Sequence, residues 1–471
     1  MQFPFFYKLL VGFTVIIGCH GCLNSVIAAD IRPEVEDSVV YYTERMEHPE
    51  NPQDFEKARS RLNSYYRSLV NYDESLVPDY DLPDPLLTDD NQPVRNQNQW
   101  TQVRRTEIKR LFEQHVYGRV PDFKYEAGYI IRSVEPDALQ GRATRKQVAV
   151  VLDKDRPELH IDMLLYIPNH VARPVPAFMG LNFYGNQAVH EDDGIRMSKR
   201  WMRPNENIGI KNNRATEQTR GVYAERWQVE KVIESGYAVV TAYCGDIDPD
   251  NYRMADQGVR SPASEVGLQP VADEWGTIAA WAWGLGRMLD YLEKDDDINH
   301  ERVAVIGHSR LGKAALWAGA TDQRFAGVIS NNSGAGGAAL SRRKFGETVA
   351  VINTSFPHWF AGNFNAFNEN ERELPVDQHM LLSLVAPRPL YVASAEEDLW
   401  ADPRGEFQSA RHASPVYELF GVEGLPVSAI PEIDQPVMGT IGYHIRSGGH
   451  AVTAYDWEQY ITFFNTHFNQ P

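Results

Sequence analysis

Ser309 stands at the junction between a short apolar run and an alanine-rich run of good helix formers. Residues 303–306 read Val-Ala-Val-Ile, which suits a buried strand, and residues 310–320 suit a helix that begins directly after the serine. Gly307 lies two places before Ser309, but the second glycine of a full Gly-x-Ser-x-Gly turn comes one place late, as Gly312. A strand, a sharp turn and a helix would hold the serine hydroxyl clear of the backbone, so Ser309 is the candidate nucleophile.

A serine nucleophile needs a base, and the base needs an acid that orients it. His450 is the candidate base, because it follows a strand-like run and two glycines that let its loop pack closely. Three consecutive carboxylates, Glu396, Glu397 and Asp398, follow an earlier strand-like run. We prefer Asp398, the deepest of the three in its loop, while the spacing alone leaves all three open.

Arg310 follows the candidate nucleophile directly. Its backbone N–H is placed to donate to an oxyanion, and its guanidinium offers a second, charged donor. A cation at a helix N-terminus opposes the helix dipole, so an arginine at this position indicates a functional reason.

The elements that must position these residues alternate between strands and helices along the chain. Helical patterns cover residues 54–70, 100–116, 227–234, 275–292 and the C-terminal segment that Thr453 caps. Strand-like runs cover residues 148–152, 161–167, 175–183, 237–243, 303–306, 325–330, 389–395 and 442–446. This alternation predicts an α/β fold with a mostly parallel central sheet and helices on both faces. Long polar stretches at 187–225 and 246–264 are predicted to be loops.

Composition limits the function further. The chain has 471 residues, of which 43% are hydrophobic and 23% charged, and its formal net charge is −18. This charge argues against nucleic acid and anionic membrane surfaces as partners. No Cys/His spacing suggests a zinc site, and we expect neither a metal nor a cofactor. We expect no transmembrane span, because no apolar run is long enough to cross a membrane. We also expect a monomer.

The N-terminal residues 1–29 have the form of an export signal, with Lys8 before the apolar run 9–17. Two endings are open: cleavage after Ala29, or a lipoprotein box that ends at Cys19. Accordingly we expect an exported protein, either periplasmic or secreted, or an outer-membrane lipoprotein. Residues 30–85 are predicted to be an N-terminal extension, and residues 86–471 the catalytic domain.

From about Asn71 to the C-terminus the chain carries a set of motifs: Gly307-His-Ser-Arg-Leu-Gly-Lys313, Ser333-Gly-Ala-Gly-Gly337, Glu396-Glu-Asp-Leu-Trp-Ala-Asp402, Gly448-Gly-His450, Gly180-Leu-Asn-Phe183, Asn213-Arg-Ala-Thr-Glu217, Gly245-Asp-Ile-Asp-Pro249 and Ser355-Phe-Pro-His-Trp359. Together these motifs resemble the bacterial branch of the glucuronoyl esterases, carbohydrate esterase family 15. This resemblance implies an α/β-hydrolase fold with a Ser-His-acid triad. It also implies hydrolysis of esters between the 4-O-methyl-glucuronic acid of xylan and lignin-type alcohols.

The resemblance assigns roles to three further residues and departs from the family at one. Lys313, Glu347 and Trp400 match positions that contact the glucuronate hydroxyls and ring in the family. Fungal members carry the triad acid in a Glu-Ser-Gly motif, whereas this chain has Asn332 before Ser-Gly. Because an amide cannot be the acid, the departure assigns that role to Asp398, as in some bacterial members.

Two alternatives remain at this point. The same fold can serve an acetyl esterase or a general carboxylesterase, since a fold does not fix a substrate. The chain can also be a non-catalytic carbohydrate-binding relative that keeps the fold, although an intact Ser309, Asp398 and His450 argues against this.

The two signal endings make different mature proteins. If Cys19 is lipidated, the mature protein begins at Cys19 and partitions into the detergent phase. N-terminal sequencing and Triton X-114 partitioning of the exported protein test this. A mature N-terminus at Ala29 or Asp30 excludes the lipid anchor.

Overall fold

The structure is a computed structural model that describes residues 33–122, 128–260 and 269–468. The predicted export signal, with Cys19 and Cys22, lies outside the described residues. Cys244 is buried and unpaired with another cysteine. None of the helices in the described ranges is long and apolar enough to span a membrane.

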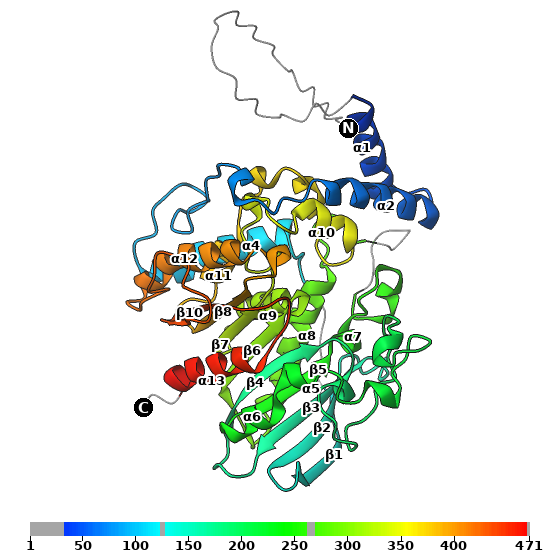
Figure 1. The fold of residues 1–471 in the computed structure, drawn as a ribbon, viewed down its shortest axis with the longest axis vertical. Helices are drawn as coiled ribbons and strands as arrows, with labels where there is room; N and C mark the ends of the chain where they lie inside the picture. Colours follow the sequence, from blue (N-terminus) through cyan, green and yellow to red (C-terminus); the bar gives the residue numbers. More distant parts are fainter. Residues whose placement is uncertain (1–32, 123–127, 261–268, 469–471) are drawn as a thin grey trace, which may run out of the picture.

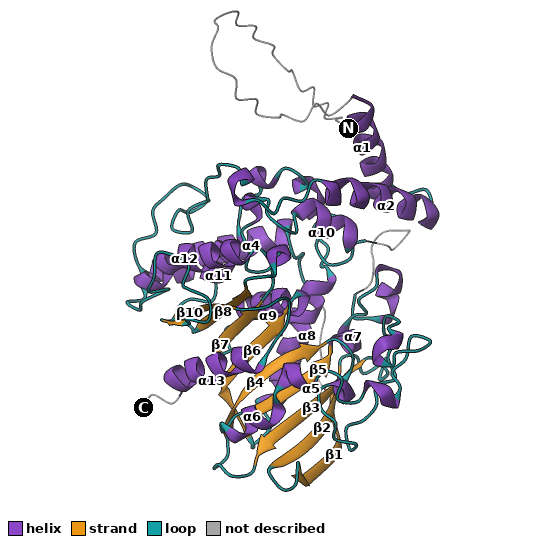
Figure 2. Ribbon diagram, in the orientation of Figure 1, coloured by secondary structure: helices purple, strands orange, loops and turns teal. Residues whose placement is uncertain are grey.

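The described residues form one ten-stranded sheet in the order β1-β2-β3-β5-β4-β6-β7-β8-β10-β9 (Figure 2). From β5 to β10 the neighbouring strands are parallel, whereas β1, β2, β3 and β5 pair in antiparallel fashion, as do β10 and β9. The strands are β1 (Gly128–Ala138), β2 (Ala143–Val151), β3 (His160–Pro168), β4 (Val175–Asn182), β5 (Ala238–Tyr243), β6 (Ile298–His308), β7 (Gly327–Asn331), β8 (Leu390–Ala395), β9 (Val437–Met438) and β10 (Ile441–Arg446).

Helices cover both faces of this sheet (Figure 1). The helices are α1 (Pro33–Glu47), α2 (Pro52–Ser68), α3 (Gln97–Gln99), α4 (Arg105–His115), α5 (Ala224–Trp227), α6 (Val229–Glu234), α7 (Cys244–Ile247), α8 (Thr277–Leu292), α9 (Arg310–Thr321), α10 (Val349–Ser355), α11 (Gln378–Ser383), α12 (Pro403–Leu419) and α13 (Ala454–Phe468). One core cluster joins the sheet to α4, α8, α9, α11 and α12, and a second joins its other face to α6 and α13.

Alternation along the central strands explains why both faces are apolar. In β4, Ala177 and Met179 belong to the first cluster, while Phe178 belongs to the second. In β6, Val305 and Ile306 divide between the two clusters in the same way. A strand that is buried on both faces reads as a continuous apolar run, which is the pattern the sequence shows.

The predicted α/β fold with its mostly parallel sheet is confirmed, and the predicted strands are present with shifts of a few residues at their ends. The sequence pattern missed β1, an edge strand whose Ile130, Ile131 and Val134 are exposed. It also missed α12, where Pro415 and several polar residues weaken the helical signal.

The N-terminal helices pack against the body of the protein. The side chain of Asn51 caps α2 by accepting from the N–H groups of Gln53 and Asp54. Apolar residues of α2, among them Phe55 and Leu62, form a small cluster with Ala350 and Val351 of α10. Figure 1 shows α2 lying beside α10, although the two are far apart in sequence. The predicted division at residues 85 and 86 stays a prediction.

Candidate active site

Ser309 occupies a tight turn between β6 and α9. Its backbone has φ 56° and ψ −132°, a conformation that L-residues rarely adopt. Such strain costs roughly 1–3 kcal/mol and persists only when the surroundings enforce it. Here the Ser309 N–H donates to the Asn331 carbonyl (2.9 Å), and the Ser309 carbonyl accepts from the Gly312 N–H (2.8 Å). The turn therefore presents the serine side chain at the C-terminal edge of the sheet.

Two glycines make this turn possible by close approach. A Cβ atom on Gly307 would lie 2.0 Å from the Leu311 carbonyl oxygen, and a Cβ on Gly312 would lie 2.9 Å from the Cβ of Ser333. The late second glycine therefore serves the contact between α9 and the loop after β7. The displaced glycine changes the sequence motif without removing the turn.

All seven candidate residues line one open pocket above this edge. The candidates are Ser309, Arg310, Lys313, Glu347, Asp398, Trp400 and His450. The other lining residues are Phe356, Trp359, Ala401 and, from the loop after β7, Asn332, Ser333 and Gly334. The seven candidates come from four separate segments of the sequence, at residues 309–313, 347, 398–400 and 450, and the fold brings them together.

The register of β8 against β10 brings the acid to the histidine. Arg446 pairs with Ala395 at the end of these parallel strands, and the chains beyond them stay hydrogen-bonded. The Glu396 N–H donates to the Arg446 carbonyl (2.9 Å), and the Glu397 N–H donates to the Gly448 carbonyl (3.1 Å). The next residues along both loops then meet at the pocket.

Of the three carboxylates, Asp398 is the one that contacts the histidine. Its Oδ2 lies 2.5 Å from His450 Nδ1 and also accepts a hydrogen bond from Asn332 Nδ2 at 2.8 Å. Asp398 is buried, whereas Glu396 is half-buried and Glu397 is exposed. A buried carboxylate on Nδ1 fixes the tautomer that leaves Nε2 free to accept a proton.

Arg310 is held in place by a carboxylate and two aromatic rings. Its Nε lies 3.1 Å from Asp250 Oδ2, and its guanidinium carbon lies 4.6 Å from the ring centre of Phe183 and 5.9 Å from that of Trp359. Burial would raise the pKa of Asp250, but the charge of Arg310 and the hydrogen bonds from His358 and Trp359 outweigh it and lower that pKa. Because Arg310 is the first residue of α9, its N–H has no acceptor within the helix. The segment thus offers preorganised donors for an oxyanion.

Lys313 and Glu347 form a buried charged pair in the pocket wall. Lys313 Nζ lies 3.7 Å from Glu347 Oε2 and donates to the Ser333 carbonyl at 2.5 Å. Burial lowers the pKa of Lys313, and Glu347 and Glu406 partly oppose this effect. Burial likewise raises the pKa of Glu347, opposed by Lys313. Such a pair can donate to and accept from the hydroxyl groups of a bound sugar.

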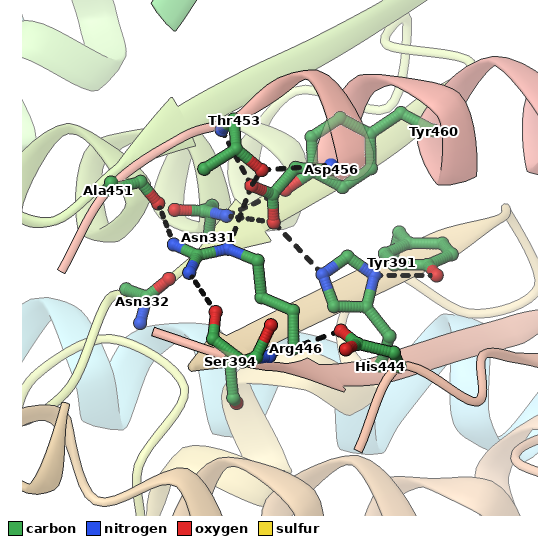
Figure 3. Close-up of polar contacts among 12 residues, drawn as sticks. Asn331, Asn332, Tyr391, Ser394, His444, Arg446, Ala451, Thr453, Asp456 and Tyr460 are labelled. Atoms are coloured by element: carbon green, nitrogen blue, oxygen red, sulfur yellow. Dashed lines mark hydrogen bonds and ion pairs between the residues drawn. The ribbon is translucent and has the colours of Figure 1, made fainter. Parts of the chain in front are cut away.

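The loop that carries His450 is clamped by a buried ion pair (Figure 3). Arg446 donates through Nη2 to the carbonyls of Gly449 (2.9 Å) and Ala451 (2.6 Å), which flank His450. Its Nε donates to Asp456 Oδ2 at 3.0 Å, near the start of α13. This arrangement fixes the backbone on both sides of the histidine.

Asp456 accepts from four other groups as well. His444 Nε2 donates to Oδ1 at 2.9 Å and Asn331 Nδ2 at 3.1 Å, while the N–H and hydroxyl of Thr453 both donate to Oδ2 at 2.7 Å. Burial would raise the pKa of Asp456, but His444, Arg446 and Thr453 outweigh it, so the pKa is lowered. The carboxylate is therefore ionised and fully engaged.

The ring of His308 packs against the ring of His450. The two ring centres are 4.4 Å apart, and His308 Nδ1 lies 2.6 Å from Asn331 Oδ1. Burial, with the nearby charges of His450 and Arg226, lowers the pKa of His308 well below its usual value. A neutral ring in this position packs against His450 and would not repel a positive charge on it.

The sequence did not predict the residues that contact and position the candidate site residues without being candidates themselves. Asp250, Arg446 and Glu406 carry no motif that links them to Ser309 or His450. Asp456 did carry a signal, since it stands three residues after Thr453 as in a capping box. Across the described ranges, no group of three or more His, Cys, Asp or Glu side chains is arranged to hold a metal ion.

The parallel strands, the strained serine turn and the paired histidine and aspartate define the α/β-hydrolase class. Comparison with known proteins narrows this class. The family model described as "Glucuronyl esterase, fungi" matches residues 227–421. Carbohydrate esterase MZ0003, from an unknown prokaryotic organism, is 50% identical over 398 residues, which cover 84% of this chain and 92% of that protein.

Two solved structures agree in fold and in sequence. One, described as a promiscuous CE15 esterase from a marine bacterial metagenome, has a TM-score of 0.79 and 50% identity and covers 85% of this chain and 100% of its own. The glucuronoyl esterase from Solibacter usitatus has a TM-score of 0.78 and 46% identity and covers 84% of this chain and 100% of its own. This chain belongs to carbohydrate esterase family 15, the family of the glucuronoyl esterases.

The buried carboxyl group of Glu406 should make the stability of the fold depend on pH. Its Oε1 accepts from the N–H groups of Ser333 (2.7 Å) and Gly334 (3.0 Å), and its Oε2 accepts from the Ser394 hydroxyl (2.6 Å). Burial raises its pKa from 4.5 to about 8. Between these values the folded state holds a proton that the unfolded state releases, so Glu406 makes the free energy of unfolding fall as pH rises, by about 1.4 kcal/mol per pH unit.

Glu406→Gln keeps an acceptor at Oε1 and cannot titrate. We expect urea unfolding between pH 5 and 8 to show a shallower loss of stability in this variant than in the wild type. Glu418→Gln, on the exposed side of the same helix, is the matched control and should keep the wild-type slope. Equal slopes in Glu406→Gln and the wild type would contradict the prediction.

Proposed function

We propose that this chain hydrolyses esters of 4-O-methyl-glucuronic acid in glucuronoxylan with lignin-type alcohols, through an acyl-enzyme on Ser309. The observation that carries the proposal is the single pocket that joins the Ser309, His450 and Asp398 group to the buried Lys313–Glu347 pair. An acetyl group would need only a small apolar slot. A wall with a buried cation and carboxylate suits an acyl group that carries hydroxyls. The name of the Solibacter usitatus relative, a glucuronoyl esterase, supports the same acyl group.

In the proposed reaction, His450 takes the proton of Ser309 as the hydroxyl oxygen attacks the ester carbon. The Arg310 N–H and guanidinium stabilise the oxyanion, and Asp398 stabilises the imidazolium. His450 then gives its proton to the leaving alcohol, and the uronoyl group stays on Ser309. A water molecule then attacks the acyl-enzyme while His450 takes one of its protons. His450 gives this proton to Ser309 Oγ as the bond to the acyl carbon breaks, which releases the uronic acid and restores the serine.

Lys313, Glu347 and Trp400 are proposed to hold the sugar. Trp400 lies in the same loop as Asp398, and its carbonyl accepts from the Glu347 N–H at 3.0 Å. A polysaccharide substrate outside the cell agrees with the export signal predicted at residues 1–29. The lipid anchor through Cys19 and the monomeric state remain proposals.

A broader esterase is the second candidate, because the similar marine structure is described as promiscuous. The two candidates differ in what the Lys313–Glu347 pair contributes. For a dedicated uronate esterase the pair is essential to binding, whereas an acetyl ester has no hydroxyls for it to bind.

Neutral variants of the pair test the acyl specificity. We expect Glu347→Gln and Lys313→Met to lower kcat/KM on methyl glucuronate about 10–100-fold, because each removes charged hydrogen bonds to sugar hydroxyls. Activity on 4-nitrophenyl acetate should fall far less. Lys344→Met removes a lysine whose Nζ lies 2.6 Å from Glu369 Oε2 outside the pocket, and serves as the control. Equal losses on both substrates would refute the assigned binding roles.

The acid is tested by three neighbouring variants. We expect Asp398→Asn to lower kcat about 10²–10⁴-fold, because an amide neither fixes the tautomer of His450 nor stabilises its charge. Glu396→Gln and Glu397→Gln are matched controls, two residues and one residue away, and should stay near wild type. Thermal unfolding confirms that each variant folds. A folded Asp398→Asn enzyme with near-normal kcat would remove Asp398 from the triad.

A further inference from the structure

The last turn of α2 reaches the edge of the pocket through Arg67. The guanidinium carbon lies 5.1 Å from the ring centre of Trp400, one of the pocket residues. Nη2 donates to the hydroxyl of Ser355 at 3.2 Å, and Ser355 directly precedes Phe356, another pocket residue. Arg67 thus spans the rim between two walls of the pocket.

A tyrosine, Tyr72, lies on the segment that follows α2. The Gly346 N–H donates to the Asn71 carbonyl at 2.9 Å, which holds the segment after α2 next to Glu347. Tyr72 follows, with its ring edge-on to Phe345 at 6.3 Å and 49% of its surface exposed. Burial raises the pKa of Tyr72, while Arg67 lowers it and Glu347 raises it, as expected for a hydroxyl near both charges.

Arg67 is not needed to attach α2 to the body. The helix is already held by its apolar cluster with α10, by Arg59 Nη1 donating to the Thr354 carbonyl (3.1 Å) and by Asn63 Nδ2 donating to the Ser355 hydroxyl (2.6 Å). Arg67 itself is exposed. Nε donates to Asn63 Oδ1 and Nη2 to Ser355, while Nη1 has no hydrogen-bond partner among the described residues. Donors are therefore available at the rim.

The chemistry of this rim suits a sugar ring. Tyrosine and tryptophan each offer an apolar face with a polar tip, and an arginine fork donates to adjacent hydroxyl oxygens. The uronate of the proposed substrate is joined to a xylan chain, which must leave the pocket through its open side.

We propose that Arg67 and Tyr72, together with Trp400, form a carbohydrate subsite that binds the sugar next to the uronate. This inference rests on the proposed function, because it extends the substrate beyond the acyl group. The N-terminal extension is then part of the substrate site and selects for uronate that is carried on an oligosaccharide.

The double variant Arg67→Ala/Tyr72→Ala tests the subsite. The readout is kcat/KM on two methyl esters, one of free glucuronic acid and one of glucuronic acid carried on a xylo-oligosaccharide. We expect a loss of about tenfold or more on the oligosaccharide ester, mainly through KM, and a clearly smaller loss on the free ester. Arg67→Lys keeps the charge without the planar fork and should recover part of the activity.

The control is Arg61→Ala/Tyr41→Ala. Arg61 is an exposed arginine on the same helix, and Tyr41, on α1, is 48% exposed, close to the value for Tyr72. This variant should keep the wild-type ratio of the two rates. Equal losses on both esters in the Arg67/Tyr72 variant would show that these residues only support Trp400, and no loss would also overturn the subsite.

A binding measurement separates this proposal from the proposed function. If the wild type hydrolyses neither uronate ester, the proposed function fails. Calorimetry with the de-esterified glucuronoxylo-oligosaccharide then decides the subsite alone. Weaker binding by the Arg67/Tyr72 variant than by the control supports the subsite, and equal affinity overturns it.

Discussion

The buried ion pair between Arg446 and Asp456 is the interaction on which the geometry of the site depends. Only 4% of Arg446 and none of Asp456 is exposed, so both charges have lost their hydration. A buried pair offsets this cost only when its remaining donors and acceptors are satisfied. Here His444, Thr453 and Asn331 donate the remaining hydrogen bonds to the carboxylate of Asp456. Backbone carbonyls of the His450 loop accept hydrogen bonds from the guanidinium of Arg446 (Figure 3). The end of β10, the start of α13 and the end of β7 are thereby locked to one another.

The pocket of this strongly acidic chain contains two cations, and each is paired with a carboxylate. The formal net charge is −18, yet Arg310 and Lys313 line the same pocket as Ser309. Each cation has its own carboxylate partner, the half-buried Asp250 for the arginine and the buried Glu347 for the lysine. These partners fix the cations in position before a substrate arrives, so little reorganisation is needed when an oxyanion forms.

The sequence was sufficient to predict those candidate site residues that follow a strand. Ser309, Asp398 and His450 each follow a strand-like run, and neighbouring parallel strands end at one edge of a sheet. Which of the three acidic residues faces His450 depended on the β8–β10 register, which spacing along the chain does not specify. The counterion Asp250 and the clamp Arg446 act through contacts that only the folded chain makes. The position of Arg67 beside Trp400 joins segments more than 300 residues apart, and no local pattern encodes such a contact.

The loop after β8 carries Asp398 and, two residues later, Trp400, whose carbonyl is bonded to the Glu347 N–H. The proposed acid and the proposed sugar platform are therefore parts of one short piece of backbone. Natural variation in this loop cannot retune sugar preference without also moving the group that orients the base. Residues 67–72 carry no part of the triad, so they can change without that constraint. Diversification of substrate range among relatives should accordingly concentrate on the N-terminal side of the pocket, while the loop after β8 varies little.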